Sequence, residues 1–254
     1  MKEQIFKHFS HILDELISEY NFFQYYFQCP YSIDEDILGE YEGGIFANYS
    51  LDMRFGASRG CIIDNCYDYV VKFDFPDQIE YASCDEELGI YEMAESLGFE
   101  KYLARPIYLG NYKKTIHTYT HRDVTDNIID FYGFNEEEFS DKLQMAVDNW
   151  DLEQEEITIE IPLYAYPRAE KYKFPKVESE ESSRFIASHS DTSPLLERST
   201  AVAMAFVKEY GEEEFEKFSE FLYERNINDL HTSNIMKIGD HLVLTDYCGF
   251  HSNY

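Results

Sequence analysis

Three side chains that could handle a phosphate and a metal ion lie close together near the end of the sequence. Asp229 and Asn234 open and close the string DLHTSN, which has the form D-x-x-x-x-N. Asp246 begins a second string, DYCG. Carboxylate and amide oxygens are ligands that Mg²⁺ prefers, and a loop carboxylate can accept a proton from an attacking hydroxyl. Single Asp and Asn residues in loops are usually turn formers, so only the combined pattern is specific.

The segment between the two strings predicts a β-hairpin. Two apolar runs, 235–238 and 241–244, flank Gly239 and Asp240. Gly-Asp is a favoured two-residue turn between antiparallel strands. Because a hairpin returns the chain to the edge from which it started, it would bring Asn234 and Asp246 to one place.

Together these features resemble the catalytic loop and the metal-binding D-F-G element of the protein-kinase-like superfamily. The resemblance implies that Asp229 is the catalytic base, that Asn234 and Asp246 hold Mg²⁺, and that ATP is the phosphate donor. The string is also similar to one in the small protein kinases that some tailed bacteriophages make early in infection. The matching residues are Asp229, His231, Asn234, Ile235 and Met236.

The resemblance also implies a lysine on the third strand and a glycine-containing turn before it. Lys72 ends the string VVK, which has the form of the last three positions of V-A-I-K. The preceding turn, GASRG at 56–60, departs from G-x-G-x-x-G and could aim fewer backbone N–H groups at phosphate. An exposed strand lysine is the alternative for Lys72 alone. The residues expected to contact the nucleotide phosphates are Gly56, Ser58, Arg59, Gly60 and Lys72.

A helix predicted over 83–97, with Gly98 as its stop signal, would supply the glutamate that pairs with Lys72. Glu87 is our choice for this role. Glu86 is the second candidate for this role, and either side chain could instead lie on a solvated face of the helix. The strand predicted over 157–164 would lead to a hinge that holds adenine, with Ile161 and Leu163 as apolar walls. Taken one at a time, such apolar residues more often belong to a core.

The implied fold is α+β, a two-lobed kinase-like fold in a single domain over 1–254. We expect an N-terminal helical extension over 1–45, because apolar residues recur at helical spacing from Ile5 to Tyr20. An N-lobe with a five-stranded type of sheet follows over 46–164, and a minimal helical C-lobe over 165–254. Within them we predict an acidic helical insert over about 111–156, a loop over 175–193, and helices over 194–225 broken near Gly211.

The formal net charge of −29 restricts the partners of this 254-residue chain. Such a charge repels nucleic acids and anionic membranes. We therefore expect neither as a partner and favour a basic protein, although a merely solvated surface would have the same composition. The five cysteines form no CxxC pair, which argues against a disulfide framework or a structural zinc site. Residues 1–10 do not form a signal peptide, so we expect a cytoplasmic protein, in the host cytoplasm if it is phage-encoded; the oligomeric state is open.

The expected function is an ATP- and Mg²⁺-dependent serine/threonine protein kinase that acts on host or partner proteins. The alternative is a catalytically degenerate kinase-fold protein that binds and inhibits a basic partner through its acidic surface. A small-molecule phosphotransferase is a third hypothesis. Such enzymes need a C-terminal helical substrate pocket, and we do not expect one in this sequence. The sequence ends at Tyr254, eight residues after Asp246, so we expect no activation segment. The residues before Asp229 are also NIN rather than the usual H-R.

Overall fold

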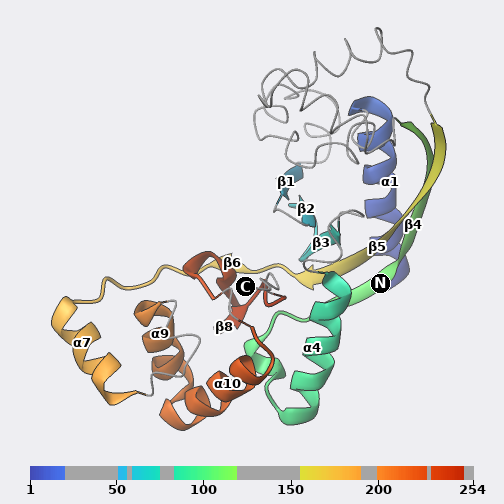
Figure 1. Ribbon diagram of the computed structural model, residues 1–254. Helices are drawn as coiled ribbons and strands as arrows, with labels where there is room; N and C mark the ends of the chain where they lie inside the picture. Colours follow the sequence, from blue (N-terminus) through green and yellow to red (C-terminus); the bar gives the residue numbers. More distant parts are fainter. Residues whose placement is uncertain are drawn as a thin grey trace, which may run out of the picture. The chain divides into compact units, whose positions relative to one another are not determined.

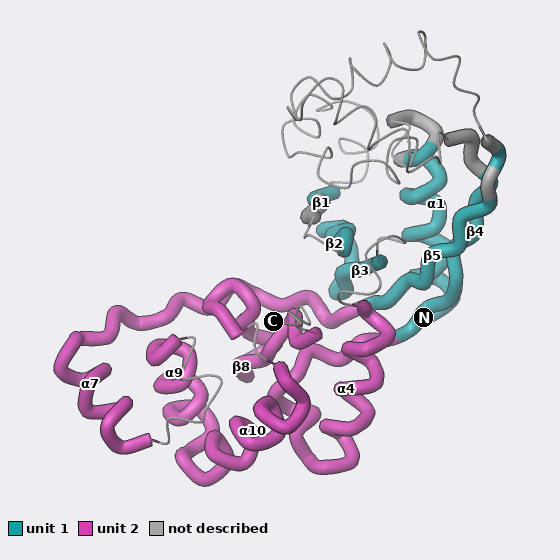
Figure 2. Tube along the Cα trace, viewed as in Figure 1, with its two compact units in different colours: residues 1–79, 108–165 teal, residues 80–107, 166–254 magenta. Residues whose placement is uncertain are grey.

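The computed structural model divides the chain into two compact units (Figures 1 and 2). The first comprises residues 1–79 and 108–165, and the second comprises residues 80–107 and 166–254. The residues that the structure describes are 1–20, 51–55, 59–74, 83–118, 155–189, 199–227 and 230–248.

The first unit is built on a five-stranded sheet with the order β1-β2-β3-β5-β4. Lys72 lies on its third strand, as expected. Both β1 with β2 and β2 with β3 pair in the antiparallel sense. The strands are β1 (Leu51–Phe55), β2 (Arg59–Asp64), β3 (Tyr69–Asp74), β4 (Ile107–Thr118) and β5 (Glu155–Pro167).

Helix α1 (Lys2–Tyr20) belongs to the first unit and lies beside β4 and β5 (Figure 1). The predicted helix is thus confirmed over Lys2–Tyr20, and it packs on the sheet; the rest of the predicted 1–45 extension lies outside the described residues. Its Asp14 accepts hydrogen bonds from Tyr112 (2.9 Å) and Lys114 (2.7 Å) of β4. The apolar stripe lies against the sheet, with the side chains of Ile5, Phe9, Ile12, Leu13 and Ile17 buried.

The β2–β3 hairpin presents two different faces. Residues directly opposite each other in an antiparallel pair share a face, so Lys72 shares one with its partner Cys61. The opposite face carries Ile62 and Phe73, which are both fully buried. It also carries Asp64, whose carboxylate lies 2.7 Å from Nε2 of His8 on α1. Helix α1 therefore lies on the side of the sheet away from Lys72.

The second unit combines a small sheet with helices. The sheet has the order β6-β7-β8, and β7 and β8 form the hairpin predicted between residues 235 and 244. Its strands are β6 (Glu170–Lys171), β7 (Ile235–Ile238) and β8 (His241–Leu244). Its helices are α4 (Cys84–Leu97), α7 (Ser179–Ser188), α9 (Thr200–Tyr210) and α10 (Glu212–Glu224), with 3₁₀ turns η3 (Glu100–Tyr102) and η4 (Thr232–Asn234).

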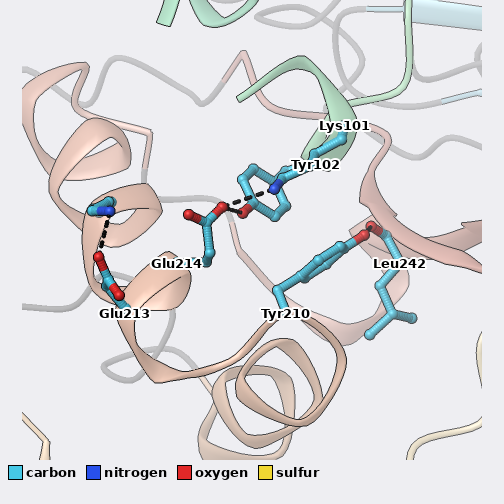
Figure 3. Close-up of polar contacts among 7 residues, drawn as sticks. Lys101, Tyr102, Tyr210, Glu213, Glu214 and Leu242 are labelled. Atoms are coloured by element: carbon cyan, nitrogen blue, oxygen red, sulfur yellow. Dashed lines mark hydrogen bonds and ion pairs between the residues drawn. The ribbon is translucent and has the colours of Figure 1, made fainter. Parts of the chain in front are cut away.

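An aromatic core holds η3 against α9 and α10. The ring of Tyr102 lies 4.4 Å from that of Phe218 and 4.6 Å from that of Tyr210, centre to centre. The Tyr102 hydroxyl donates to Glu214 (2.6 Å), and the Tyr210 hydroxyl donates to the carbonyl of Leu242 in β8 (2.6 Å), as Figure 3 shows. Buried tyrosines usually find such partners for their hydroxyls.

Capping residues account for several of the helix ends in the second unit. The Ser83 hydroxyl accepts the N–H of Glu86 at the start of α4, and Gly98 ends that helix. Ser199 caps α9 in the same way. Gly211 separates α9 from α10 with φ 89° and ψ 162°, a conformation that is essentially restricted to glycine. The predicted break between these two helices is confirmed.

The loop predicted over 175–193 is wrong in part, because residues 179–188 form helix α7. Its serine-rich sequence has little intrinsic preference for helix. Glu180 and Glu181 lie in its first turn, where negative charge is favourable. Its Phe185 ring contacts Phe215 of α10 with a ring-centre distance of 6.5 Å. Tertiary packing of this kind cannot be predicted from the local sequence pattern.

The prediction of an acidic helical insert over about 111–156 is wrong at both ends of this range. Residues 111–118 continue β4, and residues 155–156 begin β5. Lys113 pairs with Glu160 across these two strands (2.8 Å). The helical pattern predicted between Phe139 and Trp150 lies outside the described residues.

The helices that the structure describes include none with both the length and the apolar composition needed to cross a bilayer.

Candidate functional site

The hairpin β7–β8 brings Asn234 and Asp246 together in the second unit. The backbone N–H of Thr245 donates to the carbonyl of Asn234 (2.9 Å), and the Thr245 hydroxyl contacts the same oxygen (3.2 Å). The Asn234 side-chain amide lies 3.4 Å from the carbonyl oxygen of Asp246. Asn234 is buried, whereas Asp246 is half-buried. The two predicted metal ligands therefore flank the base of one hairpin.

The base of this hairpin also carries an exposed imidazole–hydroxyl pair. Nδ1 of His231 lies 2.5 Å from the Ser233 hydroxyl, between the predicted base and the predicted metal ligand in sequence. Asp229 itself lies outside the described residues, as do Gly56 and Ser58. Their predicted roles as base and as phosphate contacts stay predictions.

Glu87 is fully buried on α4 and holds two partners within the second unit. Its Oε2 accepts a hydrogen bond from the Tyr166 hydroxyl (2.6 Å), and its Oε1 accepts one from the backbone N–H of Tyr247 (3.2 Å). Tyr247 directly follows Asp246. Because Lys72 belongs to the first unit, the Lys72–Glu87 pair stays a prediction.

Glu86 contacts the same segment one residue further along. The Cys248 thiol donates to Oε2 of Glu86 (2.8 Å), and Cys248 is buried. Two adjacent glutamates of α4 thus hold the two residues that follow Asp246. Glu86 and Glu87 are alternatives for one role in the sequence, whereas the structure gives each its own contact.

Tyr166 is a residue of this site that the sequence analysis missed. Its side chain is buried at the end of β5, and its hydroxyl reaches Glu87. Burial, with nearby Cys84 and Glu87, raises the pKa of Tyr166 well above its usual value. The shift extends to higher pH the range over which the hydroxyl is a donor, since a phenol with the usual pKa of about 10 is already protonated at neutral pH. The available signal was a tyrosine at the end of an apolar strand, since a buried phenol requires a hydrogen-bond partner.

The face of the β2–β3 hairpin that carries Lys72 also carries Arg59. Arg59 stands opposite Asp74 in the register, and both side chains are buried. Gly60 lies on the other face, opposite Phe73. A Cβ at Gly60 would collide with the Phe73 ring, so packing alone explains this glycine. Its predicted contact with phosphate has no support from this geometry.

The predicted adenine walls lie within the core of the first unit. Ile161 and Leu163, on β5, are both fully buried. Burial of this kind fits the core alternative that the sequence left open. Their role in a nucleotide site stays a prediction.

The donor set at the hairpin fits Mg²⁺ only with help from other ligands. Asn234 and Asp246 offer oxygen atoms of the type that this ion prefers. Within the described part of the chain, no group of three or more His, Cys, Asp or Glu side chains could hold a metal ion. Mg²⁺ commonly takes one or two protein ligands and completes its shell with substrate phosphates and water. These residues therefore suit a nucleotide-dependent metal site.

Comparisons of the chain with protein-family models, with curated proteins and with solved structures found no match.

Proposed function

We propose that this protein is an ATP- and Mg²⁺-dependent phosphotransferase with a kinase-like fold that phosphorylates serine or threonine residues of proteins. The observation that carries the proposal is the closed hairpin that joins Asn234 to Asp246. An amide and a carboxylate held at one hairpin base provide a partial magnesium site whose remaining ligands would be nucleotide phosphates.

The order of elements along the chain supports the same proposal. A five-stranded sheet carries Lys72 on its third strand, and α4 follows that strand with a buried glutamate, Glu87. The strand β5 leads out of the sheet, and the helices and the β7–β8 hairpin come after it. This is the succession that the sequence resemblance implies.

In this reaction the residues of the chain bind and orient the nucleotide. Lys72 would neutralise the α- and β-phosphates, and Asp229 would accept the proton of the attacking hydroxyl. Asn234 and Asp246 would hold Mg²⁺. When bound, the ion would neutralise charge on the phosphates.

The first test is a measurement of nucleotide binding. Calorimetry with ATP should give binding in the presence of Mg²⁺ and much weaker binding with EDTA. Mg²⁺ without nucleotide should bind weakly, because Asn234 and Asp246 alone are too few ligands for this ion. Phosphoryl transfer would then be followed with γ-labelled ATP and a cell lysate. Binding without any transfer would favour the degenerate, partner-binding alternative, which the net charge of −29 also suits.

A second test asks whether Lys72 lies near the nucleotide. In an acyl-phosphate derivative of ATP, the acyl group is attached to the terminal phosphate. A lysine amine close to the phosphates attacks the acyl carbon and forms an amide, and the acyl–oxygen bond breaks to release the nucleotide. Lys72 should be acylated, and ATP with Mg²⁺ should prevent this. Lys101, which pairs with Glu214 in the second unit, is the control and should react equally with and without ATP. Equal labelling of Lys72 in both conditions would contradict the proposal.

A further inference from the structure

The segment that carries Asp246 is connected to the end of β5 by a chain of buried hydrogen bonds. The chain runs from the Tyr166 hydroxyl to Oε2 of Glu87 (2.6 Å), and from Oε1 of Glu87 to the backbone N–H of Tyr247 (3.2 Å). Tyr166 and Tyr247 are nearly or fully inaccessible to solvent, and Glu87 is fully buried. All three residues belong to the second unit.

The backbone after Asp246 is held at further points. The Tyr247 hydroxyl donates to the carbonyl of Ala104 (2.9 Å), and the Cys248 thiol donates to Glu86 (2.8 Å). Of these contacts, only the one through Glu87 attaches to the peptide group directly after Asp246. A rotation of Glu87 would therefore move the backbone that sets the direction of the Asp246 side chain.

Tyr166 limits that rotation. A buried carboxylate needs a hydrogen bond on each oxygen to offset the loss of water. The Tyr166 hydroxyl satisfies Oε2 and leaves Oε1 directed at Tyr247. A phenol with the usual pKa of about 10 is protonated at neutral pH, and burial raises the pKa of Tyr166 further, so this hydroxyl is a donor at neutral pH.

We propose that Tyr166 is a positioning residue for the magnesium site: through Glu87, its hydroxyl fixes the Tyr247 peptide group and hence the placement of Asp246. This inference rests on the proposed function, but it concerns a residue to which that function assigns no role. Tyr166 does not touch the nucleotide in this scheme. Its effect would appear in the use of Mg²⁺ and not in the capture of ATP.

The test compares Tyr166→Phe with a matched control, Tyr102→Phe. Both tyrosines are buried in the second unit, and the hydroxyl of each donates to a glutamate oxygen at a distance of 2.6 Å. Glu214, the partner of Tyr102, lies on α10 and also pairs with Lys101 (Figure 3). Both variants lose one hydroxyl and one hydrogen bond, but only Tyr166→Phe weakens the chain that leads to Asp246.

The first readout does not depend on activity. The rate at which N-ethylmaleimide modifies Cys248, followed by peptide mass spectrometry, reports how often the segment after Asp246 opens. Tyr166→Phe should raise this rate by roughly tenfold, as expected when a buried side-chain oxygen loses its hydrogen-bond partner. Tyr102→Phe should leave it unchanged. An unchanged rate in folded Tyr166→Phe, or an equal rise in both variants, would overturn the inference.

The second readout is the Mg²⁺ dependence of turnover at saturating ATP. Tyr166→Phe should require roughly tenfold more Mg²⁺ for half-maximal activity, in the range found for residues that orient metal ligands. Its KM for ATP, measured at saturating Mg²⁺, should be unchanged. A rise in that KM with no change in Mg²⁺ dependence would contradict a positioning role.

The two proposals can fail separately. An inactive wild-type protein would refute the phosphotransferase, while the labelling of Cys248 would still decide whether Tyr166 holds the segment. If Tyr166→Phe does not fold, Glu87→Leu replaces it in the labelling experiment. That variant keeps a side chain of similar size but can accept neither hydrogen bond, so faster labelling supports the chain of contacts and unchanged labelling refutes it.

Discussion

At the scale of single residues, tyrosine hydroxyls supply hydrogen bonds to carboxylates of a strongly acidic chain. The chain has 50 acidic residues and 21 Lys and Arg, so at least 29 carboxylates cannot be matched one-to-one with a Lys or Arg. Asp14, Glu87 and Glu214 each accept a hydrogen bond from a tyrosine hydroxyl, at 2.9, 2.6 and 2.6 Å. Asp14 and Glu214 also pair with a lysine, so at these two positions the phenol adds a hydrogen bond to an ion pair without adding a charge.

The role of Asp246 makes a prediction at the same scale. Asp246→Asn should lower Mg²⁺-dependent turnover at least about 100-fold, because a direct ligand should matter more than the residues that orient it. The neutral amide also binds a cation less strongly than a carboxylate. The melting temperature should change little, since the Asp246 side chain is only half-buried. Wild-type turnover in the purified variant would show that Asp246 has a structural role only.

At the scale of elements, the attachment of α1 to β4 should depend on pH. Burial alone would raise the pKa of Asp14, but hydrogen bonds from Lys114 and Tyr112 outweigh it and lower that pKa. A carboxyl whose pKa is lower in the folded state stabilises the protein above its unfolded pKa of about 3.9. That stabilisation is lost as pH falls through the folded value.

Asp14→Asn tests this attachment. At pH 7 the variant should be less stable by up to about 1 kcal/mol, the usual range for a pair of this exposure. The difference should shrink as pH falls below about 3.9, because Asp14 loses its charge as pH falls through its folded pKa. Urea denaturation across this pH range measures the difference. A difference that does not change with pH would mean that the charge of Asp14 contributes nothing.

The break between α9 and α10 depends on Gly211. Its φ of 89° and ψ of 162° are unfavourable for any residue with a Cβ, so Gly211→Ala should destabilise the protein by about 1–3 kcal/mol. Gly89 provides the control, because it lies inside α4 and a Cβ there would meet no atom within 4 Å. Gly89→Ala should stabilise the protein by about 0.5–1 kcal/mol. Thermal unfolding of both variants should therefore shift in opposite directions.

The elements that the sequence predicted are those with local signals. The glycine stop of α4, the glycine between α9 and α10, and the Gly239-Asp240 turn are all confirmed. Helix α7 and the length of β4 were missed, because contacts between residues distant in sequence determine them. The same holds at the site. The Asn234 and Asp246 pair follows from a hairpin of known length, whereas the Tyr166–Glu87 contact spans 79 residues and has no local pattern.

At the scale of the whole molecule, the net charge of −29 should lower stability through self-repulsion. Salt weakens repulsion between exposed charges and shortens its range from about 30 Å at 0.01 M to about 10 Å at 0.1 M ionic strength. The melting temperature should therefore rise between 0.01 M and about 0.1 M NaCl, and it should rise further at higher salt by a smaller amount. The ion pairs on this surface oppose the trend only weakly, since exposed pairs contribute little.

A comparison of two salts separates this repulsion from cation binding. Choline chloride should raise the melting temperature as much as NaCl at equal ionic strength, because screening depends on charge and concentration and not on the fit of an ion to a site. Replacing Glu212 and Glu213 by Gln, at the exposed start of α10, should reduce the salt effect while leaving the buried Phe215 in place. A melting temperature that falls or stays constant as salt increases would show that repulsion among the carboxylates does not limit the stability of this protein.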